Sequence, residues 1–266
     1  MRFKKVLIAL LVAGSLSGCQ QTEKVQSGQM APVQDEKEQA SVDTLYWMNG
    51  TYGVLLSRNG QDMKYFGGIK PGDKLTEASV KQALIDSWDI ASREDADETI
   101  KWLLDEGHNA DLLKDYEKMQ LSECTREEIK AAAEEEELMF VLGMYDAVSK
   151  YGDNAILAWD LARAMQVTTW SYKAGYYSYD EAVNKNIEIA KRLQATYDSW
   201  DDMMASYLYG YQYWSEEDAE DPSSETYIRG QVYEKLKQDQ ESPYQLDFKM
   251  PLDIEYALEN KVEELR

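Results

Sequence analysis

The spacing of apolar and polar residues divides the chain into a short segment with strand-like runs and a long segment with helical periodicity. The runs 45–48, 52–57 and 63–66 are rich in apolar and aromatic residues, and Asn49-Gly50 and Asn59-Gly60 separate them. Asn-Gly pairs supply the positive φ angles that tight hairpin turns require. The pattern therefore predicts a three-stranded antiparallel β-meander near the N-terminus.

From Thr76 onward, apolar residues recur at helical spacing behind residues that are good helix caps. Thr125 with Glu128 and Ser178 with Glu181 have the spacing of capping boxes. The predicted helices start near Thr76, Ser92, Thr125, Asp153, Ser178 and Ser199, and two more cover 227–237 and 254–265. The fold class predicted is mostly α, with about eight helices packed as one domain over residues 44–266 that includes the small β-meander.

The first residues have the pattern of a bacterial lipoprotein signal. Three basic residues precede a short apolar run over 6–16, and the segment closes on Leu16-Ser17-Gly18-Cys19. Such a run cannot cross the hydrocarbon core, which needs about 20 residues, and is typical of a cleaved signal peptide. The ending L-S-G-C resembles the lipobox of bacterial lipoproteins, which implies cleavage after residue 18 and attachment of acyl chains such as palmitate to Cys19.

The residues that follow Cys19 indicate where the mature protein lies. Each buried methylene of an acyl chain contributes about 0.8 kcal/mol, so several chains on one Cys hold a protein firmly at a membrane. Gln20 and Gln21 come next. By resemblance to Gram-negative sorting signals, they favour the outer membrane, facing the periplasm, if the source is Gram-negative. Residues 20–43 are polar and contain no aromatic residue, which predicts a disordered tether between the lipid and the domain.

The acidic balance of the chain excludes one class of partner. The chain has 28 basic and 50 acidic side chains and a formal charge of −22. Removing the three basic residues of the signal gives −22 − 3 = −25 for the mature chain. Such a surface repels phosphate backbones and anionic headgroups. We therefore expect no nucleic-acid binding, and we expect the N-terminal lipid to be the attachment to the membrane.

Few residues are available for metal or covalent chemistry. With Cys19 acylated, Cys124 is the remaining thiol, and His108 is the one histidine of the sequence. This excludes an intramolecular disulfide and the common zinc sites, which need three or four Cys or His ligands, so we expect no metal. The sequence has no P-loop, dinucleotide fingerprint, nucleophile elbow or calcium loop, and we expect no cofactor.

A series of short motifs occurs between residues 69 and 214. They are Leu75-Thr76, Ser87-Trp88-Asp89-Ile90, Ser92-Arg93, Gly107-His108, Ala158-Trp159-Asp160 with Arg163, Gly175-Tyr176, Ser178 with Glu181-Ala182, Ser199-Trp200, and Tyr207, Gly210 and Trp214. In this order they resemble a bacterial family that is numbered 1266 among the domains of unknown function. The resemblance implies a helical fold and no particular activity.

Trp159, Asp160 and Arg163 lie on one predicted helix that is apolar nearly all round and is therefore expected to be central. Asp160 and Arg163 are three residues apart and share a helix face. A charged pair in such a place must be hydrogen-bonded or lie at the wall of a cleft. Two interpretations follow. Either an ion pair ties helices together, or Asp160 acts as an acid or ligand contact in a cleft where Arg163 holds an anion.

Trp200, Tyr207, Tyr211 and Trp214 form an aromatic stripe along another predicted helix. Aromatic residues at that spacing usually belong to a core. The chain has 19 Tyr and 7 Trp but only 4 Phe, an excess of rings with polar groups that suits interfaces and sugar stacking. The stripe is therefore either core or a binding surface. His108 follows a predicted helix-ending glycine, where a histidine satisfies the last carbonyls of the helix.

These patterns favour a non-enzymatic, lipid-anchored envelope protein that binds a protein partner through its helical domain. The alternative is a glycan- or peptidoglycan-binding module, or a hydrolase, that uses Asp160 and aromatic platforms. No catalytic residue is assigned, and Cys19 is the lipidation site. The candidate binding residues are His108, Trp159, Asp160, Arg163, Tyr176, Trp200, Tyr207 and Trp214.

Overall fold

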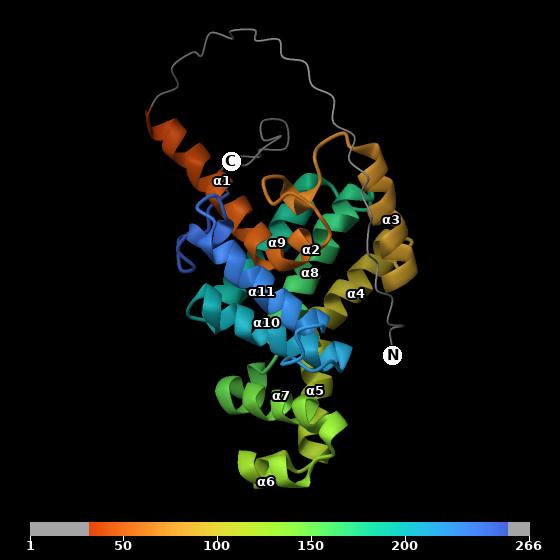
Figure 1. The fold of residues 1–266 in the computed structure, drawn as a ribbon. Helices are drawn as coiled ribbons and strands as arrows, with labels where there is room; N and C mark the ends of the chain where they lie inside the picture. The colour runs from red at the N-terminus through yellow and green to blue at the C-terminus, as the bar shows by residue number, and fades with distance from the viewer. Residues whose placement is uncertain (1–31, 255–266) are drawn as a thin grey trace.

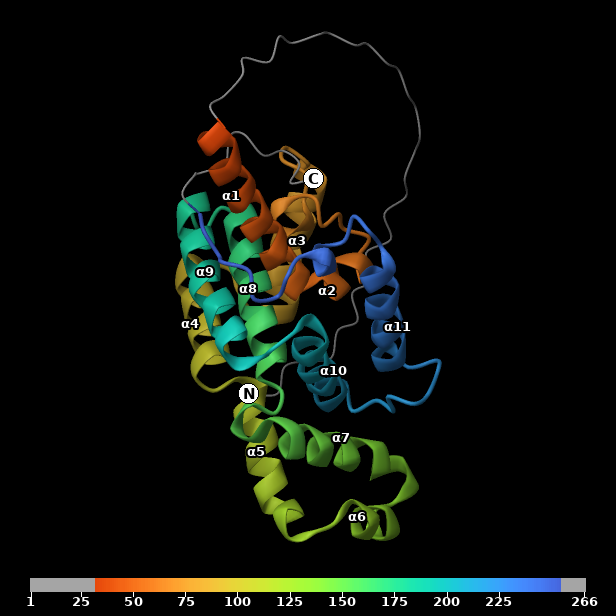
Figure 2. The ribbon, with the colours of Figure 1, turned by 90° about the vertical axis from the view of Figure 1, so that its left-hand side faces the viewer.

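The structure, a computed structural model, describes residues 32–254 (Figures 1 and 2). Within these residues it contains eleven α-helices, four 3-10 helices and no β-strand. The α-helices are α1 (Pro32–Thr51), α2 (Gly53–Arg58), α3 (Lys74–Trp88), α4 (Arg93–Asp105), α5 (Gly107–Lys118), α6 (Arg126–Ala132), α7 (Glu135–Tyr151), α8 (Leu157–Lys173), α9 (Tyr179–Thr196), α10 (Trp200–Ser215) and α11 (Glu225–Gln238). The 3-10 helices are η1 (Phe66–Gly68), η2 (Leu121–Glu123), η3 (Gly152–Asn154) and η4 (Pro243–Gln245). The predicted signal, Cys19 and residues 255–265 of the last predicted helix lie outside the described residues.

Helix α8 lies at the centre of the molecule, as its sequence predicts (Figures 1 and 2). Fourteen of its 17 residues are buried. It packs against α3, α4, α5, α9 and α10, because a helix with apolar side chains on every face is stable only when neighbours cover all of them. The main hydrophobic core surrounds this helix and extends from α1 to the segment after α11.

Most of the other helices begin at a residue whose side chain accepts a hydrogen bond from the first turn. These N-caps are Asp73, Ser92, Thr125, Ser178, Ser199 and Ser224. Each one satisfies a backbone N–H that the helix itself leaves without a partner. The predicted starts at Ser92, Thr125, Ser178 and Ser199 are confirmed, and so is the mostly α fold class.

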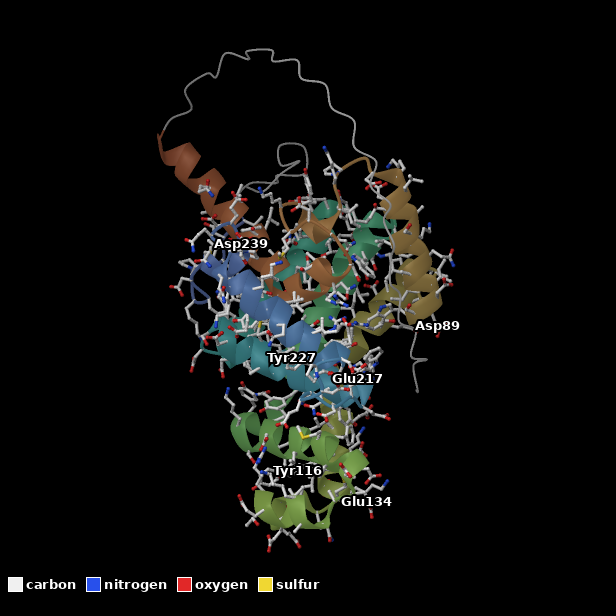
Figure 3. The ribbon with its side chains drawn as sticks, in the orientation of Figure 1. Asp89, Tyr116, Glu134, Glu217, Tyr227 and Asp239 are labelled. Atoms are coloured by element: carbon white, nitrogen blue, oxygen red, sulfur yellow. The ribbon has the colours of Figure 1, made fainter. Side chains whose placement is uncertain are left out.

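Helices α5, α6 and α7 form a lobe that projects from the main bundle (Figure 2). The lobe has a hydrophobic cluster of its own, which includes Leu112, Ile129 and Leu142. The prediction of one long helix after Thr125 is wrong, because the chain is extended between α6 and α7. Four consecutive glutamates (134–137) repel one another inside a helix, and at the start of α7 the helix dipole favours them instead. Glu134 is exposed at this break (Figure 3).

The prediction of a β-meander is also wrong, since residues 45–51 lie in α1 and residues 53–58 lie in α2. Asn49 is fully buried in α1, and its side-chain amide donates to the carbonyl oxygens of Met63 and Tyr65, both at 2.8 Å. Position 50 requires a glycine because of close packing and not because of a turn: an added Cβ would lie 2.9 Å from Cη2 of Trp200. The Asn49-Gly50 pair therefore serves tertiary packing and not a hairpin turn. Gly60 does adopt a positive φ of 66°, in the turn that follows α2.

Helix α1 also shortens the predicted tether. Composition predicts disorder over 20–43, whereas the structure is helical from Pro32. The C-terminal half of this helix explains the difference, because Leu45, Tyr46 and Trp47 are almost completely buried in the core. Burial of these side chains stabilises the helix that presents them. Residues 19–31 lie outside the described residues, and a tether there stays a prediction.

Across residues 32–254, no helix combines the length and the apolar composition that spanning a membrane requires.

Candidate functional site

Asp160 and His108 form a structural unit at the junction of α8 and the lobe. Asp160 is fully buried, and its Oδ1 accepts the backbone N–H of His108 at 3.0 Å and the ring Nδ1–H at 2.7 Å. Its Oδ2 accepts the backbone N–H of Asn109 at 2.8 Å. The carboxylate of α8 therefore caps the N-terminus of α5, where the helix dipole favours a negative charge.

The backbone of α5 is shaped to fit this carboxylate. Gly107 has a φ of +63°, and a Cβ on it would lie 2.4 Å from Oδ2 of Asp160. His108 follows as a residue of the first turn of α5, between the rings of Trp102 and Trp159, with centroid distances of 5.1 and 6.2 Å. The prediction that His108 satisfies the C-terminal carbonyls of a helix is therefore wrong, because it lies at the start of one.

The predicted ion pair between Asp160 and Arg163 does not form. Asp160 is occupied by α5, and no hydrogen bond or ion pair joins Arg163 to another residue in the range 32–254. The role of Asp160 as an acid in a cleft does not fit this geometry, because a carboxylate that is fully buried and accepts three hydrogen bonds is not available to a substrate.

Arg163 instead lies between two indole rings. Its guanidinium carbon is 4.4 Å from the ring centroid of Trp88 and 4.8 Å from that of Trp159. The side chain is partly exposed, whereas its Nε is buried and has no hydrogen-bond partner among the described residues. The pKa of Arg163 is lowered to about 10, mainly by burial; Tyr207 opposes this shift, and the nearby Arg229 contributes to it. The guanidinium remains charged at neutral pH.

Arg229 of α11 is the second cation at this place. Its guanidinium carbon lies 4.1 Å from the ring centroid of Tyr211, and its Nη1 donates to the Tyr207 hydroxyl at 3.2 Å. Burial opposes its charge, but Tyr207, Tyr211 and Glu225 outweigh burial and raise the pKa of Arg229. Glu225 lies 3.5 Å from Nε of Arg229. Sequence reasoning missed Arg229, because a single arginine in a short polar helix gives no signal.

The single carboxylate of Glu225 does not neutralise both Arg163 and Arg229, because it also forms an ion pair with Arg58. Arg58 donates to its two carboxylate oxygens at 2.7 and 2.8 Å. Such a bidentate pair is the strongest arrangement of guanidinium and carboxylate. Glu225 is thus shared by Arg58 and Arg229, whereas Arg163 has no ion pair within residues 32–254 and is attracted only indirectly by the nearby carboxylate of Asp160.

Aromatic side chains surround the two arginines. The ring of Trp159 lies 5.3 Å from Tyr207, 5.6 Å from Tyr211 and 6.0 Å from Trp214, measured between centroids. Trp214 is partly exposed, and the other three are buried. We call this group the arginine–aromatic cluster; it consists of Trp88, Trp159, Arg163, Tyr207, Tyr211, Trp214 and Arg229. It brings together four of the residues predicted from sequence, namely Trp159, Arg163, Tyr207 and Trp214.

One face of α8 at this cluster has several buried polar atoms without a partner. They are Nε1 of Trp159, Nε of Arg163, Oε1 of Gln166 and Nε1 of Trp170, within the part of the chain that the structure describes. Their spacing of four, three and four residues places them on one side of the helix. More than nine in ten buried polar groups in proteins are hydrogen-bonded. Two of these atoms, Nε1 of Trp159 and Nε of Arg163, belong to the arginine–aromatic cluster.

The structure places the remaining predicted residues elsewhere. Trp200 belongs to the core, where its ring packs on Trp47 and Phe248 and its Nε1 donates to the carbonyl of Leu246. Tyr176 lies beyond the C-terminal end of α8, with the ammonium of Lys81 5.2 Å from its ring centroid. Five of the seven tryptophans are buried, and Trp102 and Trp214 are partly exposed, so none of them presents a fully exposed ring.

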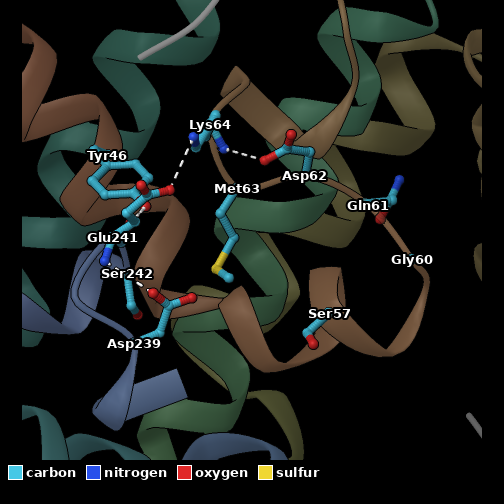
Figure 4. Close-up of a pocket in the computed structure, with 10 residues that line it drawn as sticks. All are labelled: Tyr46, Ser57, Gly60, Gln61, Asp62, Met63, Lys64, Asp239, Glu241 and Ser242. Atoms are coloured by element: carbon cyan, nitrogen blue, oxygen red, sulfur yellow. Dashed lines mark hydrogen bonds and ion pairs between the residues drawn. The ribbon is translucent and has the colours of Figure 1, made fainter. Parts of the chain in front are cut away.

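A pocket of about 360 Å³ lies between the segments that follow α2 and α11 (Figure 4). Its charged lining residues include Asp62, Lys64, Asp239 and Glu241. Lys64 pairs with Glu241 at 3.2 Å, and Asp62 and Asp239 each accept the backbone N–H two residues ahead. These groups already have local partners, so the pocket is a weaker candidate than the arginine–aromatic cluster.

No group of three or more His, Cys, Asp or Glu side chains within residues 32–254 is arranged to hold a metal ion.

Comparison with known proteins places the cluster inside a family domain. The model of a family of proteins of unknown function, DUF1266, matches residues 83–248. The uncharacterised protein YbeR of Escherichia coli strain K12 is 27% identical over 153 residues, which cover 57% of this chain and 65% of that relative. The match thus spans slightly less than two thirds of the relative. No solved structure matches. Because the family model covers more than half of its length, the chain belongs to the DUF1266 family.

Proposed function

We propose that this chain is a lipid-anchored, non-enzymatic binding protein of the bacterial envelope, and that its helical domain binds an acidic partner at the arginine–aromatic cluster. The observation that supports this most is Arg163, a guanidinium held between two indole rings with no ion-pair partner among the described residues. The Nε of this guanidinium is buried without a hydrogen-bond partner among the described residues, which costs free energy. A partner that supplies a negative group offsets this cost when it binds.

The fate of the acid–base candidates supports binding and not catalysis. Asp160 and His108 are the titratable residues that the sequence singles out, and they are bonded to each other at 2.7 Å. Their role in fixing α5 accounts for their types and positions. A general acid or base must be within reach of a substrate proton, which the full burial of Asp160 prevents.

The place in the envelope is proposed from the N-terminal sequence. A Cys19→Ala variant is expected to leave the membrane fraction, because the acidic chain has no basic patch to hold it at anionic lipids. A Cys124→Ala variant removes the other thiol and is the matched control, which should stay with the membranes. If Cys19→Ala still fractionated wholly with membranes, another anchor would have to exist.

The partner is proposed to be an envelope protein that presents an acidic group. This suits the cluster, because arginine and aromatic residues are the types that dominate protein interfaces. An acidic partner also suits the charge of the protein. A chain with a formal charge of −22 repels most acidic surfaces, and the two arginines of the cluster provide a place where an acidic group is attracted instead.

Site-specific photo-crosslinking in intact cells tests this proposal. A crosslinking residue at Trp214, the partly exposed edge of the cluster, is compared with one at Glu188 on the exposed side of α9. The proposal expects a discrete crosslinked protein from position 214 that disappears when Arg163→Gln is added, and none from position 188. Equal products at both positions, or a product at 214 that ignores Arg163→Gln, would overturn it.

A further inference from the structure

Helix α3 has an apolar stripe on the face that points away from the core. It lies at the edge of the bundle (Figure 1), and its inner face buries Val80, Leu84 and Trp88. On the opposite face, Leu75 is 83% exposed and Ile85 is 37% exposed. They are two of the three large hydrophobic side chains that are exposed in the described part of the chain. Two such residues on one face of one helix are not the scatter of single apolar residues that ordinary surfaces show.

The outer face of α3 has the spacing of a coiled-coil seam. The exposed residues at intervals of three, four and three are Leu75, Ala78, Gln82 and Ile85. These are the intervals between successive a and d positions of a heptad, along which a second helix can lie. With Leu75 at position a, Ala78 and Ile85 are d positions and Gln82 is the second a position. A polar residue at a single a position fixes the register of two helices at a cost in stability.

The charges beside the seam favour a second copy of the same helix in parallel orientation. Lys81 is at position g and Asp86 at the following position e, on opposite sides of the stripe. In a parallel pair, g of one helix lies beside the following e of the other, so Lys81 of each copy meets Asp86 of the second copy. In an antiparallel pair g lies beside g, and the two Lys81 ammonium groups repel each other.

Both charged groups are available for such a contact. Lys81 and Asp86 are exposed. The ammonium of Lys81 lies 5.2 Å from the ring centroid of Tyr176, and Oδ1 of Asp86 accepts Nε2 of Gln82 at 2.8 Å. A carboxylate accepts several hydrogen bonds, so Oδ2 of Asp86 can still accept one from a second helix.

We infer that α3 pairs in parallel with α3 of a second copy, so that two chains form a two-fold symmetric dimer. Leu75 and Ile85 of each copy pack on the same residues of the other, and Lys81 and Asp86 form two ion pairs across the seam. Helix α3 has 15 residues and a length of about 22 Å. A contact of this length buries less than the roughly 1,200 Å² of total surface found in stable complexes. The dimer is therefore weak and exchanges with the monomer.

Disulfide trapping in the purified full chain tests this pairing, because it captures weak dimers. Ala78→Cys is the reporter, in a Cys124→Ala background. The d positions of a parallel pair face each other, and this substitution changes the stripe least. After mild oxidation with copper phenanthroline, we expect at least five times more disulfide-linked dimer than from Glu188→Cys on the exposed side of α9. The background chain without an added cysteine corrects for any product formed through Cys19.

Matched variants of the Ala78→Cys reporter show which contacts form the dimer. Leu75→Ser removes an apolar side chain that is 83% exposed and leaves the core intact, and it is expected to lower the dimer yield at least fivefold. Lys81→Glu brings like charges together and is expected to do the same. Lys81→Glu combined with Asp86→Lys restores opposite charges, so the yield should return to within twofold. Lys101→Glu makes the same charge change on the exposed side of α4 and should leave the yield within twofold.

Three outcomes overturn the inference. Equal dimer yields from Ala78→Cys and Glu188→Cys would show that α3 does not pair. A product that forms only when Ala78→Cys chains are mixed with Gln82→Cys chains would show an antiparallel contact. A double charge reversal that does not restore the yield would show that Lys81 and Asp86 do not meet. None of these results bears on the proposed partner, because crosslinking from position 214 reports on the arginine–aromatic cluster.

Discussion

The carboxylate of Asp160 and the imidazole of His108 are 2.7 Å apart, although 51 residues separate them in the sequence. With the backbone N–H groups of His108 and Asn109, this contact fastens the lobe to the central helix. Asn109 strengthens the same junction, because its side chain accepts the N–H of Ile156 and donates to the carbonyl of Asp153. The start of α5 is thus held from the side by α8.

Removal of this cap is expected to destabilise the protein. Asp160→Ala leaves three buried donors without an acceptor, so we expect a loss of about 3 kcal/mol in the free energy of unfolding. Urea denaturation measures it, with Asp160→Asn as a milder variant that keeps the shape. Asp198→Ala removes a carboxylate whose side chain is 96% exposed and should change stability by less than about 0.5 kcal/mol. Equal midpoints for Asp160→Ala and wild type would contradict the capping role.

The same contact explains why α5 is absent from the sequence-based prediction. Ser92, Thr125, Ser178 and Ser199 reveal their helices because each cap bonds to a backbone N–H only three residues away. The carboxylate that caps α5 belongs to another helix, α8. The first residue of α5 is a glycine, and in a short stretch of sequence a glycine indicates the end of a helix. No pattern within a short window of sequence includes such a cap.

The β-meander fails for a related reason. Asn49-Gly50 has the local chemistry of a turn, but Asn49 bonds to the segment around Met63 and Gly50 makes room for Trp200. Tertiary contacts select the same two residue types for a different purpose. Apolar runs such as 45–48 suit a buried helix as well as a strand, and periodicity cannot separate the two at this length.

The candidate site is predictable only in part. Trp159 and Arg163 share one helix, and Tyr207 and Trp214 share another, so the sequence predicts that the two members of each pair lie near each other. That the two helices meet, and that Trp88 and Arg229 complete the cluster, depends on packing between elements distant in sequence. The charge balance at Arg163 likewise becomes visible only when its neighbours are known.

Arg163 is expected to contribute to partner binding and to add little to the free energy of unfolding. In Arg163→Met, the loss of two cation–π contacts, worth about 1 kcal/mol each, is offset because the buried Nε that lacks a hydrogen-bond partner is removed. We expect the urea midpoint to be equal to wild type or higher. Arg229→Met, by contrast, removes partners of Tyr207 and Glu225 and is expected to lose about 2 kcal/mol. A loss above about 2 kcal/mol in Arg163→Met would show that the residue is structural.

The approach of α8 to α10 depends on Gly210. A Cβ at this position would lie 2.2 Å from Cβ of Trp159, so Gly210→Ala must separate the two helices that frame the cluster. Overpacking of this kind costs about 1–3 kcal/mol or more, which a thermal melt will show as a lower midpoint. Gly230→Ala is the matched control, because its nearest neighbour is 3.9 Å away and alanine favours the helix by up to about 1 kcal/mol. Equal effects of the two substitutions would contradict the close approach.

The ion pair between α4 and α9 is expected to make stability depend on pH in the acid range. Arg93 donates to Glu181 at 2.6 Å, and together with the N–H of Ser178 it lowers the pKa of Glu181 from 4.5 to about 2. A carboxyl group whose pKa is lower in the folded state stabilises the fold above its unfolded pKa and loses this contribution as the pH falls from about 4.5 to about 2. In Glu181→Gln the group no longer titrates, so the urea midpoint should start lower at neutral pH and fall less steeply between pH 5 and pH 2.5. Glu188→Gln makes the same change of charge on the exposed side of α9, where Glu188 pairs with Lys191 one turn away, and its curve should run parallel to that of wild type. Parallel curves for wild type and Glu181→Gln would show that the Arg93 contact does not persist in solution.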